Sequence, residues 1–86
     1  MNIQEIHNLF LQCKSLSIDT RKIEKDSMFF AIKGENFDAN TFAKQALTDG
    51  AAYAIIDNAE FAKGEKYILV DDVLAALQNL AKHHWF

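Results

Sequence analysis

The stretch Met28-Phe29-Phe30-Ala31-Ile32 is an uninterrupted apolar run that stops at Lys33-Gly34. A run of this length suits a β-strand and is too short for a helix of ordinary length. Apolar side chains at every position, rather than at every second one, are expected where both faces of a sheet are covered. The run therefore predicts a buried strand inside a layered α/β domain.

Two elements are predicted before this strand. Residues 2–13 repeat apolar side chains at the spacing of one helix face, which indicates an amphipathic helix. Leu16 and Ile18 then alternate with polar residues, which indicates a short, half-buried strand that leads into Thr20 and Arg21.

A second helix is predicted after the strand. Residues 42–50 keep one apolar face, and Asp38 or Asn40 is placed to cap the start of this helix. Gly50 stands where many helices end in a left-handed residue. The segment before the helix, from Gly34 to Asn40, is rich in turn-forming residues and is expected to be a loop.

The second half of the chain completes the fold class. Residues 51–56 and 67–70 indicate two more buried strands, joined by a connection over 57–66. Asp71 or Asp72 is placed to cap a last helix that continues to the end of the chain. Helices separated by short apolar strands predict an α/β fold, with a small mixed or mostly parallel sheet of about four short strands and three helices packed on it.

Size and charge exclude several classes of protein. The 86 residues, with a mass of 9.8 kDa, are expected to form a single domain over 1–86. The 9 Lys and Arg residues against 12 Asp and Glu residues give a formal charge of -3, which argues against a nucleic-acid binder with a broad basic face. No apolar run approaches the ~20 residues of a membrane span, and the first residues lack a signal-peptide pattern. We therefore expect a cytoplasmic protein with no membrane span.

The motifs that the sequence lacks exclude several chemistries. The glycines stand at 34, 50 and 64, so neither a Gly-x-x-x-x-Gly-Lys-Ser/Thr loop nor a Gly-x-Gly-x-x-Gly loop is present. His83 and His84 are adjacent and would point about 100° apart on a helix, so no metal site is expected. Cys13, the single cysteine, excludes a disulfide within the chain and is expected to pack as a small apolar side chain. We expect no catalytic residue in this chain.

Two polar loops remain as candidates for a binding site, one over 19–22 and one over 33–38. If the strands before them are neighbours, the loops converge at the edge of the sheet where α/β folds usually bind ligands. Arg21 and Lys33 suit phosphate oxygens, and a glycine at 34 lets a ligand approach the main chain closely. Asn36 offers a donor and an acceptor to a base, and Phe37 offers a stacking surface. The residue types suit a nucleoside diphosphate.

Each of these residues also has a purely structural interpretation. Arg21 is close enough in the sequence to Glu24 and Asp26 to pair with either at the surface, and such an ion pair contributes about 0–1 kcal/mol to stability. Phe37 suits a core anchor beneath the loop, and Asp38 suits a helix cap. The residues alone leave both interpretations open.

The same two loops resemble the N-terminal domain of the Mur ligases, the ATP-dependent amide ligases that build the peptidoglycan stem peptide. The resemblance lies in the turn Asp19-Thr20-Arg21, the apolar strand, and the loop from Gly34 to Asn40, and it extends with weaker matches over nearly all of residues 15–84. Within the family, the sequence from Lys33 to Asp38 most resembles that of the ligases that add D-alanyl-D-alanine to UDP-N-acetylmuramoyl-tripeptide (MurF). The ligases that add the third amino acid (MurE) are the alternative.

The resemblance implies a role for the chain within a larger three-domain ligase. The first domain of the family holds the UDP end of a UDP-N-acetylmuramoyl-peptide, while the missing central and C-terminal domains bind ATP with Mg²⁺ and the incoming amino acid or dipeptide. It implies a UDP-binding set of Thr20, Arg21, Lys33, Gly34, Glu35, Asn36, Phe37 and Asp38. On this basis the chain alone needs no cofactor and is expected to be inactive as a ligase. A stand-alone ligand-binding or interaction module remains the alternative from another class.

Overall fold

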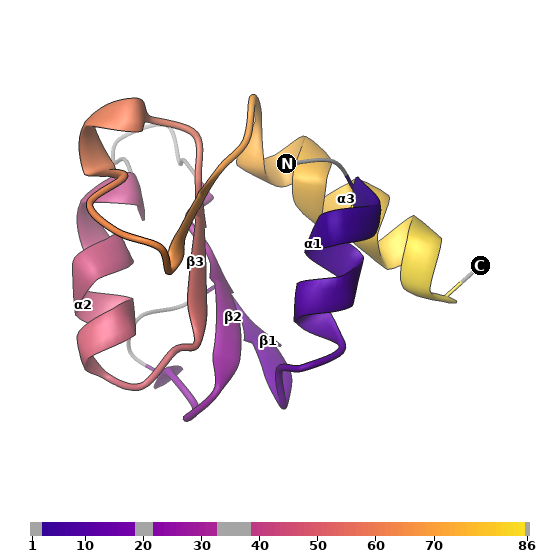
Figure 1. Ribbon diagram of the computed structural model, residues 1–86, viewed down its shortest axis with the longest axis horizontal. Coiled ribbons are helices and arrows are strands. Elements are labelled where there is room, and N and C mark those ends of the chain that lie inside the picture. Colours follow the sequence, from indigo (N-terminus) through magenta and orange to yellow (C-terminus); the bar gives the residue numbers. More distant parts are fainter. Residues whose placement is uncertain (1–2, 19–21, 33–38, 86) are drawn as a thin grey trace.

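The computed structural model describes residues 3–18, 22–32 and 39–85 of the chain (Figure 1). The elements in chain order are α1 (Ile3–Phe10), β1 (Ser15–Ser17), β2 (Ser27–Phe30), the 3₁₀ helix η2 (Ala39–Phe42), α2 (Ala43–Thr48), β3 (Tyr53–Ile56), the 3₁₀ helix η3 (Ala59–Phe61), β4 (Tyr67–Leu69) and α3 (Val73–Trp85).

The four strands form one parallel sheet in the order β1-β2-β3-β4. Phe29 of β2 pairs with Ser17 of β1 on one side and with Ala54 of β3 on the other. Ile55 of β3 pairs with Ile68 of β4. The predicted α/β class, with about four short strands and three helices, is confirmed, and the described sheet is parallel throughout.

Helices cover both faces of this sheet. Figure 1 shows α1 and α3 on one side of the strands and α2 on the other. Met28 and Phe30 point into the core on the side of α1 and α3, whereas Phe29 and Ala31 point into the core beneath α2. All four side chains are buried, so the apolar run predicted a strand covered on both faces correctly.

The amino-terminal elements are shorter than predicted. Helix α1 ends at Phe10, and the following residues close turns in which Leu11 donates to the His7 carbonyl and Cys13 to the Phe10 carbonyl. Strand β1 ends at Ser17, so Ile18 lies beyond the last ladder pair and is 56% exposed. The prediction that Ile18 is half-buried in the strand is therefore wrong.

The end of α2 was predicted better than its start. The N–H groups of Gly50 and Ala51 donate to the carbonyls of Leu47 and Ala46, which forms a Schellman cap, and Gly50 has a φ of 120°. At the start, the N-cap residue is Phe42, with no side-chain cap bond, because η2 leads directly into the helix. Asn40 lies within η2 and does not hold the N-cap position, and Asp38 lies outside the described residues.

The last helix begins as the sequence predicted. The Asp72 carboxylate accepts the N–H of Ala75 at 3.1 Å, which identifies Asp72, rather than Asp71, as the cap of α3. Helix α3 has 13 residues. Within the described part of the chain, no helix combines the length and the apolar character needed to cross a membrane.

Candidate functional site

The two candidate loops follow neighbouring strands. β1 and β2 are adjacent and parallel, so the chain leaves both at the same carboxyl edge of the sheet. The segment 19–21 follows Ile18, and the segment 33–38 follows Ile32. The two loops were predicted to converge if the strands before them are neighbours, and this condition is met. This edge of a parallel sheet is also where α/β proteins usually bind ligands.

The predicted binding residues themselves lie outside the described residues. Their roles therefore remain predictions, and the full set is Thr20, Arg21, Lys33, Gly34, Glu35, Asn36, Phe37 and Asp38.

The described residues beside the second segment show how the chain turns away from the sheet. The N–H of Ala31 still donates to the carbonyl of Ile55 on β3, at 3.0 Å. The N–H of Ile32 donates instead to the carbonyl of Phe30, also at 3.0 Å, which is the bond of a three-residue turn. The last ladder pair of β2 is thus at Phe30, its last hydrogen bond to β3 comes from Ala31, and Lys33 directly follows Ile32 in the chain.

The other half of the same edge is acidic. Asp57 follows β3, and Asp71 and Asp72 follow β4; with Ile32 and Leu74 they line a cavity of about 370 Å³. The Asp57 carboxylate accepts the N–H of Val73 at 3.3 Å, so Asp57 and Asp72 both accept amide protons in the first turn of α3. Their negative charges neutralise the positive end of the helix dipole, and this half of the edge is therefore unfavourable for a phosphate.

The role of Asp57 was missed by the sequence analysis, which placed it only at the start of a connection. A carboxylate directly after a parallel strand is a usable signal, because the next helix begins at the same edge of the sheet. Among the described residues, no group of three or more His, Cys, Asp and Glu side chains is arranged to hold a metal ion.

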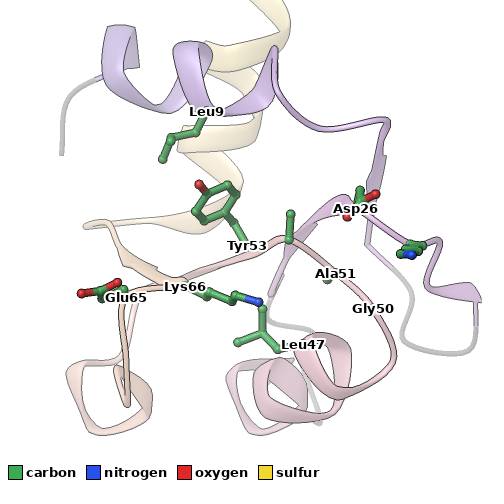
Figure 2. A pocket seen from close by; sticks show the side chains of 10 residues that line it. Leu9, Asp26, Leu47, Gly50, Ala51, Tyr53, Glu65 and Lys66 are labelled. Carbon is green, nitrogen blue, oxygen red and sulfur yellow. The ribbon is translucent and has the colours of Figure 1, made fainter.

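A larger cavity, of about 690 Å³, lies at the opposite, amino edge of the sheet (Figure 2). Its lining includes Asp26, Ala52 and Lys66, which directly precede β2, β3 and β4. Tyr53 lies with Leu9 on one side of β3, while Leu47 lies on the other side, so the cavity extends across both faces of the sheet. It is not the predicted site, because both candidate loops leave from the carboxyl edge.

Cys13 does not have the environment of a nucleophile. Its Sγ lies 3.4 Å from the carbonyl oxygen of Leu9, to which the thiol donates. Partial burial, and secondly the charge of Asp26, raise the pKa of the Cys13 thiol. The protonated thiol packs against the core on the side of α1 and α3, as a small apolar residue does.

Comparison with known proteins identifies the family. The model of the Mur ligase family, catalytic domain, matches residues 12–85. The UDP-N-acetylmuramoyl-L-alanyl-D-glutamate--2,6-diaminopimelate ligase of Rickettsia conorii is 47% identical over 64 residues, which are 74% of this chain and 13% of that protein. The UDP-N-acetylmuramoyl-tripeptide--D-alanyl-D-alanine ligase of Bacillus subtilis is 44% identical over 69 residues, which are 78% of this chain and 15% of that protein.

Solved structures give the same result. MurF ligase from Thermotoga maritima, in complex with ADP, superposes with a TM-score of 0.75 at 25% identity, over 85% of this chain and 17% of that one. MurF from Acinetobacter baumannii superposes with a TM-score of 0.71 at 26% identity, over 93% of this chain and 20% of that one. The chain thus spans a small part of the length of each relative. With the family model matching most of its residues, this chain belongs to the Mur ligase family.

Proposed function

We propose that this chain is the N-terminal domain of a Mur ligase and anchors the UDP end of UDP-N-acetylmuramoyl-tripeptide, to which the parent enzyme adds D-alanyl-D-alanine. The observation that carries the proposal is the adjacency of β1 and β2, from whose carboxyl ends the two family-like segments leave. The names of the two relatives reported above, both ligases of UDP-N-acetylmuramoyl substrates, support the choice of ligand. We assign the contacts to the predicted set of Thr20, Arg21, Lys33, Gly34, Glu35, Asn36, Phe37 and Asp38.

The acidic half of the carboxyl edge supports a position for the diphosphate. Asp57 and Asp72 occupy the start of α3 and repel a second anion there. The predicted cations Arg21 and Lys33 belong to the other half, after β1 and β2. A diphosphate is therefore held on the side of β1 and β2, where its charge is balanced.

The contribution of this domain to the reaction is positional. In the parent enzyme, ATP with Mg²⁺ would phosphorylate the terminal carboxylate of the tripeptide, and the amine of D-alanyl-D-alanine would displace the phosphate to form the amide, leaving ADP and phosphate. The sequence contains no triphosphate-binding loop for the first of these steps. Although the matching family model is described as a catalytic domain, we therefore assign anchorage to this chain. Contacts to a remote nucleotide handle position the reacting end and lower the entropic part of the barrier.

The test is a titration of the ¹⁵N-labelled chain with UDP, followed by backbone amide shifts. Shifts concentrated at 18–22 and 32–42 are expected, and shifts confined to the amino-edge cavity around Lys25 and Lys66 would contradict the assignment. ATP turnover by the isolated chain is expected to equal background, because the residues for that chemistry belong to the rest of the parent.

A second candidate is the ligase that adds the third amino acid of the stem peptide. The 47% identity to the 2,6-diaminopimelate ligase of Rickettsia conorii favours it, whereas the MurF superpositions favour the D-alanyl-D-alanine ligase. ADP release by the full-length parent separates the two. The first candidate requires the tripeptide precursor with D-alanyl-D-alanine, and the second requires the dipeptide precursor with a diamino acid. A cytoplasmic location of the parent is part of the same proposal.

A further inference from the structure

Three histidines gather where α1 packs against α3. The Nε2 atom of His7, on α1, lies 3.1 Å from the Nδ1 atom of His84, near the end of α3. The ring of His83 meets that of His7 edge to face, with centroids 4.7 Å apart, and the ring of Phe10 lies 5.2 Å from that of His84. Sequence spacing relates only the adjacent residues 83 and 84, because His7 is 77 positions away from His84.

A proton is the ligand that this arrangement suits. Among the residues that the structure describes, no three or more His, Cys, Asp and Glu side chains are arranged to hold a metal ion. At 3.1 Å, one imidazole nitrogen donates its proton and the other accepts it, so the contact exists when both rings are neutral or when one is charged. When both rings are charged, each facing nitrogen carries a proton and the hydrogen bond is lost.

We propose that His7 and His84 form a proton-sensitive contact between α1 and α3. The contact holds α1 against α3 while at most one of the two rings is protonated. When both rings are protonated, the contact is lost and α1 packs less tightly against α3. Helix α1 contributes the buried Ile6 to the core on this side of the sheet. Acidification therefore weakens the cover of that core.

The positive charges that α3 places around the pair act in the same direction, whereas the carboxylate of Glu5 on α1 opposes them. Helix α3 presents His83 beside His7 and carries Lys82 next to it, and α1 itself carries Glu5 two residues before His7. The sheet contributes apolar side chains to this interface, from Met28, Phe30, Ile55 and Ile68. The histidines and Lys82 thus make the end of the interface positive at low pH.

The direction of the titration agrees with this geometry. Partial burial of His7, followed by the charges of His83 and His84, lowers the pKa of His7 from its ordinary value of 6.5. A lowered pKa in the folded state means that the unfolded or detached helix binds the proton more tightly. The stabilisation is therefore complete above pH 6.5 and is lost as the pH falls through the lowered pKa.

Amide hydrogen exchange of the 86-residue chain tests the proposal, with protection factors corrected for the intrinsic rate at each pH. We expect the protection of α1 to fall about two- to tenfold between about pH 7.5 and about pH 5, the range implied by the loss of one net hydrogen bond. Helix α2 carries no histidine and serves as the internal control, with little change expected.

Two variants isolate the pair. His84→Gln keeps a side chain that forms hydrogen bonds but does not titrate, so the acid-dependent loss in α1 is expected to disappear. His83→Gln leaves the pair intact, so this variant is expected to retain the acid-dependent loss of amide protection in α1. Equal protection of α1 at both pH values in the unaltered chain would overturn the proposal, and so would a full loss in His84→Gln. If that variant does not fold, NMR titration of the rings decides: coupled two-step titration of His7 and His84 supports the contact, and independent titration overturns it.

Discussion

The backbone N–H of Asp26 donates a hydrogen bond of 2.8 Å to the carbonyl oxygen of Gly50, and both residues have a positive φ, 64° and 120°. The bond connects the turn before β2 to the Schellman cap that ends α2. The N–H of Lys14 in turn donates to the carbonyl of Asp26 at 2.9 Å. The residue before β1, the turn before β2 and the carboxyl end of α2 are thus linked through Asp26 and Gly50, both in a conformation that most side chains disfavour.

The substitution Gly50→Ala is expected to destabilise the chain by about 1–3 kcal/mol, the cost of holding a side chain at such a φ. A Cβ at Gly50 would lie 3.4 Å from the Cα of Lys25, which is ordinary contact, so strain rather than a clash is the cause. Urea unfolding measures the change. Gly64→Ala is the matched control, since among the described residues a Cβ there meets only Tyr67, at 3.9 Å, and about 0.5 kcal/mol or less is expected.

The substitution Ser27→Ala is expected to stabilise the chain. Ser27 is 0% exposed, and its hydroxyl has no hydrogen-bond partner among the described residues. Removing an unsatisfied buried hydroxyl relieves a desolvation penalty of about 1–3 kcal/mol. The reverse change at a buried site on the same face, Ala54→Ser, is expected to lower the free energy of unfolding by a similar amount. Loss of stability in Ser27→Ala would show that the hydroxyl has a partner.

The substitution Asp72→Ala is expected to cost about 0.5–2 kcal/mol, because it removes the side-chain cap of α3. Asp71→Ala provides the comparison at the neighbouring carboxylate, and its effect is expected to stay within about 0.5 kcal/mol. Thermal unfolding followed by circular dichroism distinguishes the two. Equal losses in both variants would indicate that net charge, rather than the cap, controls the stability.

Alkylation of Cys13 is expected to be slower in the folded chain than in denaturant, because burial and then Asp26 raise the thiol pKa above its ordinary value of 9.0 and the thiolate is the reactive form. Because the pKa of the thiol is raised in the folded state, the unfolded state loses this proton at a lower pH. The contribution of the protonated thiol to stability is therefore complete below pH 9.0 and is lost as the pH rises from 9.0 through the raised pKa. Iodoacetamide labelling followed by mass spectrometry measures the rate. Asp26→Asn removes the second cause, and faster labelling of that variant is expected.

The substitution Arg21→Ala is expected to weaken UDP binding by about 1–3 kcal/mol, the range for a hydrogen bond to a charged group. Lys25→Ala is the matched control, because it removes a cation from the cavity at the amino edge of the sheet. Isothermal titration calorimetry at constant salt compares the two variants. Equal weakening in both would indicate a general effect of charge and would contradict a site at the carboxyl edge.

The sequence was sufficient for the fold class because its strongest signals concern burial and backbone conformation. The apolar run from Met28 to Ile32 is explained by two cores on opposite faces of β2. The position of Gly50 after an amphipathic segment predicted the end of α2. Both signals are local, so they are readable without knowledge of the neighbouring elements.

The wrong or missed predictions concern features that depend on contacts with other elements of the fold. Whether Ile18 is covered depends on where the ladder between β1 and β2 ends, and alternation alone does not fix that point. The start of α2 depends on η2, which periodicity does not distinguish from a loop. The contacts of Asp57 with α3, and of His7 with His84, join residues far apart in the chain, which single-sequence patterns do not bring together.

For the candidate site, the sequence provided the residue types and their order, and the resemblance provided the ligand. The structure adds that the two loops follow adjacent strands, while the roles of the predicted residues, from Thr20 to Asp38, remain untested predictions.

The carboxylates of Asp57 and Asp72 also give the carboxyl edge a polarity along the sheet. By accepting amide protons at the start of α3, they remove the attraction that a free helix terminus exerts on anions. If the proposed site is correct, an elongated ligand with one anionic end and one neutral end would have a preferred direction along this edge. Reversing it would bring its charge against the two acids.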